Sequence, residues 1–168
     1  VVYLYECGHR NIAFFGRGGG KKSGFISASS ELNIYNEENV IFVENDYYKD
    51  YQEYEKELIL KFSKLWNSDN RPTALVLDSQ NLAMGFLNVF IKLKISIPDD
   101  LSLITYDDIP EYFMYPVRLT TVSPSFSEMA DIIINRFEDY YKGNTEKNES
   151  YTVVPQLVMR DSVKKING

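Results

Sequence analysis

Short runs of consecutive apolar residues recur along the chain, each bounded by polar, glycine-rich or proline-containing segments. Runs of this length that are apolar at nearly every position are typical of strands buried on both faces of a parallel sheet. The pattern predicts strands at residues 11–16, 40–43, 73–77, 101–105, 119–122 and 152–159, the last one interrupted by Pro155.

Between these runs, apolar residues return at spacings of three and four, which indicates amphipathic helices. Ser125 and Glu128 form a capping box at the start of the last helix. In the helix at 48–66, Glu57 and Lys61 are expected to pair on the outer face. The expected helices include residues 21–33, 48–66 and 125–141. Another helix follows Asp78 and Ser79, either of which can cap it. Residues 1–7 are the end of a helix that stops at Gly8.

Strands that alternate with helices predict an α/β fold with a mainly parallel sheet flanked by helices. In such sheets, ligands bind outside the carboxyl ends of the strands. Asp78 and Ser79 follow one predicted strand, and Asp107 and Asp108 follow the next. Because adjacent residues on an extended backbone point to opposite sides, we do not expect the two aspartates to act on one substrate atom as a catalytic pair.

The composition argues against several classes of function. The net charge is −6 and the basic residues form no block, which argues against a surface that grips nucleic acid. The single cysteine, Cys7, excludes an internal disulfide and suits a reducing compartment. No apolar run is long enough to span a membrane. His9 is the only histidine, so we expect no metal site, no cofactor and no catalytic triad, and therefore no enzyme.

One segment nearly matches a phosphate-binding loop. Residues 16–23 (GRGGGKKS) lie between a predicted strand and a predicted helix, and residues 75–78 (LVLD) resemble the magnesium-holding strand of a nucleotide hydrolase. Only three residues separate the outer glycines, and Lys22 intervenes before Ser23. Loop length matters because backbone N–H groups must surround the phosphates, so the hydrolase is a remote alternative to a loop at the mouth of a cleft.

Seven short motifs follow one another along nearly the whole chain. They are residues 8–13 (GHRNIA), 72–74 (PTA), 83–85 (AMG), 97–102 (IPDDLS), 106–108 (YDD), 119–122 (LTTV) and 157–162 (LVMRDS). In this order and at these intervals, they resemble the lactose-repressor (LacI/GalR) family of bacterial transcription regulators.

The resemblance implies a fold like that of type I periplasmic binding proteins, with two α/β lobes joined by crossovers. On that pattern, residues 10–114 and 150–168 form the C-terminal lobe. Residues 1–9 end a helix of the N-terminal lobe, and residues 115–145 are a crossover segment of that lobe. The chain does not begin with methionine, so we expect a fragment with an incomplete N-terminal lobe. Its apolar segments at 119–122 and 126–140 would then favour self-association.

The resemblance also implies polar residues of an effector site. Asp107 matches the family's effector-binding aspartate. Ser79 stands where the family usually has a ligand-contacting asparagine, and it could also cap the following helix. Lys21 replaces an effector-binding arginine, and Arg17 nearby could substitute for that arginine.

Two aromatic residues complete the expected site. Phe126 matches an aromatic residue on the cleft wall, although it also begins an apolar helical stripe. Tyr47 lies at a strand–helix junction where the family often supplies another aromatic residue.

By this resemblance, the chain is the ligand-sensing domain of a bacterial DNA-binding transcription regulator, a repressor whose effector is a sugar or a phosphorylated sugar. Lys21 and Arg17 near a helix start favour an anionic effector. The resemblance implies a cytoplasmic homodimer, without membrane contact, that reaches operator DNA only through a module absent from this chain. The first alternative is a solute-binding protein for transport, which shares the fold, and the second is the nucleotide hydrolase.

Overall fold

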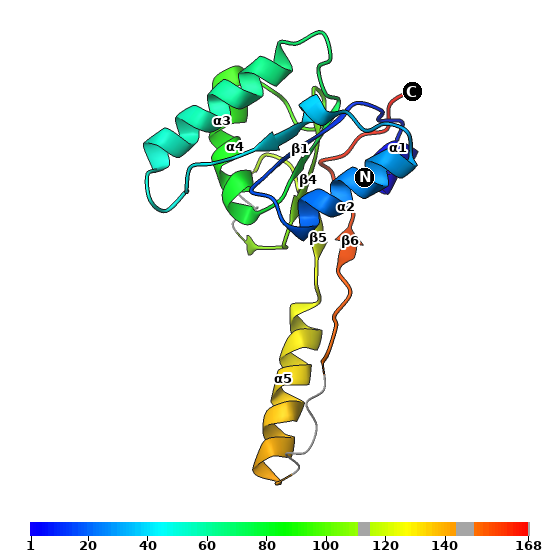
Figure 1. Ribbon diagram of the computed structural model, residues 1–168, viewed down its shortest axis with the longest axis vertical. Helices are drawn as coiled ribbons and strands as arrows, with labels where there is room; N and C mark the ends of the chain where they lie inside the picture. The colour runs from blue at the N-terminus through cyan, green and yellow to red at the C-terminus, as the bar shows by residue number, and fades with distance from the viewer. Residues whose placement is uncertain (111–114, 144–149, 168) are drawn as a thin grey trace.

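A six-stranded sheet runs through the part of the chain that the computed structural model describes, residues 1–110, 115–143 and 150–167 (Figure 1). The strand order is β2–β1–β3–β4–β5–β6, and every neighbouring pair is parallel except β5 with β6. The predicted α/β class with a mainly parallel sheet is confirmed. The strands are β1 (Ile12–Gly16), β2 (Val40–Phe42), β3 (Ala74–Leu77), β4 (Ser102–Tyr106), β5 (Thr120–Ser123) and β6 (Gln156–Val158).

Each predicted helix is present, and the start of the third helix differs from the prediction. The helices are α1 (Val2–Glu6), α2 (Gly20–Glu31), α3 (Tyr51–Trp66), α4 (Gln80–Leu93) and α5 (Phe126–Tyr141), with a short 3-10 helix η1 (Glu37–Asn39) before β2. Ser79 caps α4 by accepting a hydrogen bond from the N–H of Leu82, and Ser125 caps α5 by accepting one from Glu128. In the described ranges, no helix has the length and apolar character needed to cross a membrane.

Helix α3 begins at Tyr51, later than the start at residue 48 that the sequence suggested. The residues before it form a turn in which the carboxylate of Asp46 accepts the N–H of Tyr48 at 2.9 Å. Asp50 then caps the helix by accepting the N–H of Glu53 at 3.0 Å. The capping aspartate therefore sets the start of α3, and Tyr47 and Tyr48 belong to the preceding loop.

Successive side chains of each strand point to opposite faces of the sheet, and they pack in two apolar cores, one on each face. Helices α3 and α4 cover the face that contains Phe15, where the rings of Phe62 and Phe86 meet it edge to face. Helices α1 and α2 cover the other face, where Phe14 packs against Phe25 and Leu4 (Figure 1). The sheet is thus buried between two helical layers over most of its width, as the uninterrupted apolar runs predicted.

Two elements that the sequence assigned to the N-terminal lobe pack against this sheet. The strand predicted at 119–122 is β5, whose Thr121 lies opposite Thr105 of β4 on one side and Val158 of β6 on the other. Leu4 of α1 is fully buried in the core on the α2 face. The order of motifs could not reveal that both elements find their packing partners within this chain. The division into two lobes itself stays a prediction.

Helix α5 projects away from the body, beyond the carboxyl end of β5 (Figure 1). None of its residues is buried, and its large apolar side chains are exposed: Phe126, Met129, Ile133, Ile134, Phe137, Tyr140 and Tyr141. The polar loop predicted at 143–150 falls largely on residues 144–149, which lie outside the described residues.

The segment that follows β6 is hydrogen-bonded to β4 and β5. Ser162 is fully buried, and its hydroxyl donates to the carbonyl of Leu103 at 2.6 Å and accepts the N–H of Thr120 at 2.7 Å. Further on, the N–H of Lys164 donates to the hydroxyl of Ser102 at 3.1 Å. These bonds join the last part of the chain to β4 and β5 near the amino ends of the two strands, at the end of the sheet opposite the candidate site.

Candidate ligand-binding site

Strands β1, β3 and β4 lie side by side and parallel, so their carboxyl ends meet at one edge of the sheet. Residues that the sequence singled out follow each of these ends: Arg17 after β1, Asp78 and Ser79 after β3, and Asp107 after β4. The topology thus gathers polar groups that are far apart in the sequence at the edge where open α/β sheets bind ligands.

The carboxylate of Asp78 joins the ends of β1 and β3. Its Oδ2 accepts the N–H of Arg17 at 2.7 Å, and its own N–H donates to the carbonyl of Phe15 at 3.0 Å. A Cβ at Gly16 would collide with this carboxylate, so glycine at that position permits the close approach. Asp78 is buried, and it forms part of the floor of the candidate site.

Lys21, in the first turn of α2, reaches both β3 and β4. Its Nζ donates to the carbonyl of Asp78 at 2.7 Å and lies 4.5 Å from the centre of the Tyr106 ring. The carbonyl and the ring face together hold the ammonium group at the carboxyl edge. A positive charge is therefore fixed where an effector is expected, and its contact with an effector stays a prediction.

Asp107 leaves the extended backbone of β4 and has a φ angle of 63°. Aspartate adopts this left-handed conformation more readily than most residues, and the N–H of Asp107 donates to the carbonyl of Val122 at 2.9 Å. The expectation that Asp107 and Asp108 lie on opposite sides of an extended strand therefore assumed the wrong backbone. Asp108 is instead engaged by a partner of its own.

Asp108 forms a two-point ion pair with Arg160. The two terminal nitrogens of the guanidinium donate hydrogen bonds to the two carboxylate oxygens, at 2.8 and 2.6 Å. This hydrogen-bonded cation holds the pKa of Asp108 below its ordinary value. Arg160 also donates to the carbonyl of Leu119 at 2.7 Å, so the pair joins the end of β4 to the segments beside β5 and has a structural role.

The guanidinium of Arg17 binds the loop between β2 and α3. Its Nη1 donates to the carboxylate of Asp46 at 2.9 Å, and its Nη2 donates to the carbonyl of Asn45 at 2.7 Å. The hydrogen bond from Arg17, with that from the N–H of Tyr48, lowers the pKa of Asp46 below its ordinary value. Arg17 thus holds the loop that carries Tyr47, and its substitution for an effector-binding arginine stays a prediction.

Glu57 of α3 binds the backbone of the same loop. Its two carboxylate oxygens accept the N–H groups of Glu44 and Asn45, each at 2.8 Å, and Lys61 donates to it at 2.7 Å. Burial would raise the pKa of Glu57, but these three hydrogen bonds outweigh burial and lower it. The predicted pair with Lys61 is confirmed, whereas its predicted place on the outer face is wrong, because Glu57 is 9% exposed.

A small cavity of about 30 Å³ lies where this loop meets the start of α4. It is lined by Arg17, Val43, Tyr47, Tyr54, Ser79, Asn81 and Leu82. Three predicted site residues, Arg17, Tyr47 and Ser79, therefore line one cavity. Sequence reasoning missed Tyr54 and Asn81 as site residues, and the only signal for Tyr54 was its place in the apolar stripe of α3.

Phe126, another predicted site residue, does not pack against the sheet or its flanking helices. It begins α5, which projects from the same carboxyl edge, and its side chain is exposed. Its predicted role on a cleft wall is thus neither supported nor contradicted by its packing. Within residues 1–110, 115–143 and 150–167, no cluster of histidine, cysteine and carboxylate side chains is arranged to hold a metal ion.

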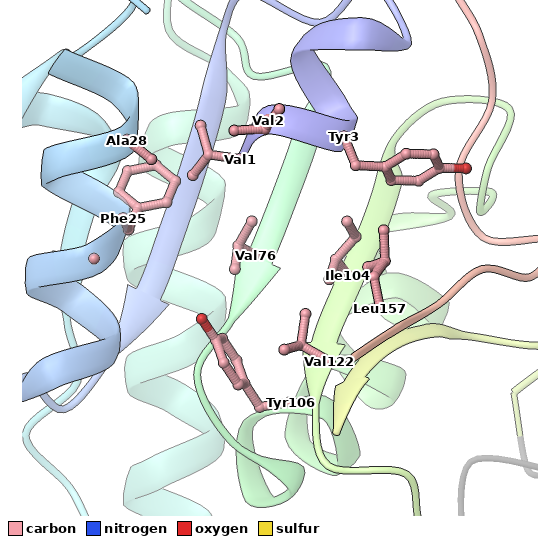
Figure 2. A pocket seen from close by; sticks show the side chains of 11 residues that line it. Val1, Val2, Tyr3, Phe25, Ala28, Val76, Ile104, Tyr106, Val122 and Leu157 are labelled. Atoms are coloured by element: carbon pink, nitrogen blue, oxygen red, sulfur yellow. The ribbon is translucent and has the colours of Figure 1, made fainter. Parts of the chain in front are cut away.

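A larger hollow of about 370 Å³ lies on the other face of the sheet (Figure 2). Its lining comes from α1, α2 and the neighbouring strands, and it is mostly apolar: Val1, Val2, Tyr3, Gly24, Phe25, Ala28, Val76, Ile104, Tyr106, Val122 and Leu157. Tyr106 contributes its ring here and also meets Lys21. Apart from the phenol groups, this hollow offers few polar side chains, so it is a weaker candidate for binding a sugar-like molecule.

Residues 1–163 match the family model described as a periplasmic binding protein-like domain. The chain is also similar to curated repressors. It is 30% identical over 167 residues to the HTH-type transcriptional repressor PurR of Klebsiella pneumoniae, a match that covers 96% of this chain and 47% of that protein. The PurR of Glaesserella parasuis is 28% identical, with 98% of this chain and 50% of that protein covered. The chain spans about half the length of these relatives.

Solved structures share the fold. A sugar-binding transcriptional regulator of the LacI family from Escherichia coli, complexed with phosphate, aligns with a TM-score of 0.75 at 21% identity, over 98% of this chain and 58% of that one. The LacI-family regulator CCPA from Weissella paramesenteroides, with bound glucose, aligns with a TM-score of 0.75 at 24% identity, over 99% and 60% of the two chains. The repressor relatives favour the regulator over the transport protein and the nucleotide hydrolase.

Proposed function

We propose, since the chain belongs to the periplasmic binding protein-like domain family, that it senses the effector of a LacI-type transcriptional repressor. The observation that carries the proposal is that Lys21, Ser79 and Asp107 all lie at the carboxyl edge of one parallel sheet. That edge is the ligand-binding edge of open α/β sheets, and the relatives of this chain are repressors.

The effector in this proposal is a sugar or a phosphorylated sugar. Asp107 accepts hydrogen bonds from effector hydroxyls, Ser79 offers a hydroxyl that can donate and accept, and Lys21 supplies positive charge. Lys21 is held by the Asp78 carbonyl and the Tyr106 ring, so it loses little conformational freedom when an anion binds. Tyr47 and Phe126 supply aromatic surface for the apolar face of a sugar ring, and Arg17 adds a second cation.

The effector changes operator affinity by stabilising one of two arrangements of the protein. A ligand shifts such an equilibrium only by the difference between its affinities for the two states. In this proposal, the carboxyl edge forms one wall of the effector cleft, and the intact protein is a cytoplasmic homodimer that binds operator DNA through another module. The net charge of −6 on this chain fits DNA contact elsewhere in the protein.

Calorimetry on the full-length protein tests the proposal, with a panel of neutral sugars, their phosphate esters and inorganic phosphate. We expect saturable binding of a sugar, and tighter, salt-sensitive binding of its phosphate ester. Lys21→Gln should abolish the preference for the ester, while Lys22→Gln, which removes the same charge one position away, should preserve it. Absence of binding across the panel would contradict the proposal, and equal binding of ester and neutral sugar would contradict the role of Lys21.

A further inference from the structure

Tyr54 carries a buried hydroxyl for which the described residues provide no hydrogen-bond partner. The residue is 2% exposed, and it packs in the core between α3 and α4. A buried polar group without a partner lowers stability, so such groups are rare in native proteins and call for an explanation. A phenylalanine would fill the same space without that penalty.

Tyr54 also lines the small cavity beside the carboxyl edge, together with Ser79 and Asn81 at the start of α4. The cavity volume of about 30 Å³ is enough for one water molecule or one group of similar size. Two aromatic rings form one side of the cavity, where the ring of Tyr47 meets that of Tyr54 edge to face with a centroid distance of 5.6 Å. The residue that carries the unpartnered hydroxyl therefore lines a space of defined size among polar neighbours.

The charges around the cavity favour a neutral occupant. Burial raises the pKa of Tyr54, and the negative charges of Asp78 and Glu57 raise it further, while Arg17 opposes them. The phenol is therefore un-ionised at neutral pH and can donate a hydrogen bond. The guanidinium of Arg17 already binds Asp46, and the nearby carboxylates would repel a second anion. A hydroxyl fits these surroundings better than a carboxylate or a phosphate.

We propose that this cavity receives one hydroxyl group of the effector and that Tyr54 donates a hydrogen bond to it, which makes Tyr54 a specificity-determining residue. Ser79 and Asn81 lie beside the same group and complete its hydrogen bonds. The inference rests on the proposed sensing function and adds that the effector presents an uncharged hydroxyl at this position. Any phosphate of the effector lies toward Lys21 instead.

The test is a comparison of ligands and variants in the full-length protein. The probes are D-glucose, sucrose and the monodeoxy analogues of whichever sugar binds, together with its phosphate ester. In the unaltered protein, one monodeoxy analogue should bind about tenfold more weakly than the parent sugar. In Tyr54→Phe, the parent sugar should weaken by about the same factor, and removal of that hydroxyl should cause little further loss, because the two changes delete the same hydrogen bond.

Tyr51→Phe is the matched control, since the Tyr51 hydroxyl accepts a hydrogen bond from Asn88 at 2.6 Å and does not line the cavity. It should leave the affinities unchanged. Tyr54→Phe should unfold at the same or a higher temperature, so a loss of binding cannot be assigned to misfolding. If no probe binds the unaltered protein, the sensing function and this inference both fail. If the sugar binds equally well to Tyr54→Phe, only a water occupies the cavity, and this inference alone is overturned.

Discussion

Gly85 of α4 leaves the space that the ring of Tyr54 occupies. A Cβ at Gly85 would lie 2.8 Å from Cε1 of Tyr54, and 2.7 Å from Cδ1 of Leu58. Both neighbours are fully or almost fully buried in the core between α3 and α4. The two helices therefore approach each other closely because one position of α4 has no side chain, and this approach sets the position of the Tyr54 ring.

Gly85→Ala should destabilise the protein by about 1–2 kcal/mol. Overpacking a close-packed core costs about 1–3 kcal/mol, and the better helix propensity of alanine offsets at most about 1 kcal/mol of this. Urea denaturation measures the difference. Gly24→Ala is the matched control, because Gly24 also lies within a helix but a Cβ there would meet nothing within 4 Å, and it should stabilise the protein. Equal effects of the two substitutions would contradict the close-packing argument.

His9 should make stability depend on pH in the mildly acidic range. Its ring is fully buried, Nε2 donates to the carbonyl of Lys164 at 3.1 Å, and Nδ1 accepts the hydroxyl of Thr73 at 2.9 Å. Burial lowers the pKa of His9 below its ordinary value of 6.5. The unfolded chain therefore binds the proton first as the pH falls below 6.5, and folding stability declines between that value and the lowered pKa.

The slope from one such proton is at most about 1.4 kcal/mol per pH unit. His9 is the only histidine in the chain, so the variant His9→Gln isolates its contribution. Urea denaturation at a series of pH values from about 5 to 7 should give a steeper decline for the unaltered protein than for His9→Gln. Parallel curves would show that His9 has the same proton affinity in the folded and unfolded states.

The pair of Asp108 and Arg160 should contribute to stability at neutral pH. The two side chains are 34% and 26% exposed, so solvent screens their attraction, and we expect Asp108→Asn to cost only about 1 kcal/mol. The pKa of Asp108 is lowered in the folded state, so its contribution is present above its ordinary pKa and is lost as pH falls through the lowered value. The stabilities of the variant and the unaltered protein should therefore converge in acid.

Asp161→Asn is the control for that experiment. Asp161 also pairs with an arginine, Arg118, but both side chains are more than half exposed, so the substitution should leave stability unchanged. A loss as large as that of Asp108→Asn would mean that exposure does not decide the strength of these pairs.

Asp107 should be tested with asparagine, because its φ angle of 63° is strained for most residues but tolerated by asparagine. If Asp107 binds the effector, Asp107→Asn should weaken binding by about 1–3 kcal/mol, the range for a charged group lost from a hydrogen bond. Calorimetry of the full-length protein measures the affinity. Asp69→Asn, an exposed aspartate in the turn before β3, should bind normally. Unchanged affinity in folded Asp107→Asn would remove Asp107 from the site.

Sequence patterns predicted features that depend on neighbours in the chain. The caps at Ser79 and Ser125 are local, since each binds an N–H three residues further on. Spacing identified Ser125, and it left Asp78 and Ser79 as the two candidates for the other cap. The surroundings of Glu57 could not be predicted in this way, because its partners Glu44 and Asn45 come from a loop that only the folded chain brings close.

The same limit applies to the site. The strand-end rule brought Ser79 and Asp107 to one edge, because parallel strands in register share that edge. It could not show that Asp107 adopts a left-handed backbone or that Asp108 pairs with a residue 52 positions away. Nor could it separate Tyr54 from the other apolar-face residues of α3, since its distinguishing feature is a missing hydrogen-bond partner among the described residues.

The apolar face of α5 should make the chain self-associate. Ile133 and Phe137 are 53% and 61% exposed, and they lie one turn apart on the same side of the helix. Covering each such side chain gains roughly 1.5–3 kcal/mol. The strand at 119–122, which we expected to favour self-association, is instead paired on both sides by β4 and β6. Association should therefore depend on α5.

Sedimentation velocity at several concentrations of the 168-residue chain should reveal reversible association. Phe137→Glu places a charge in the middle of the α5 face and should shift the chain toward the monomer at every concentration, because burying an unpaired carboxylate is costly. Leu60→Glu is the matched control, since Leu60 is 72% exposed on α3, and it should associate like the unaltered chain. A monomer at all concentrations would contradict the prediction. Association that Leu60→Glu disrupts and Phe137→Glu does not would place the contact on α3.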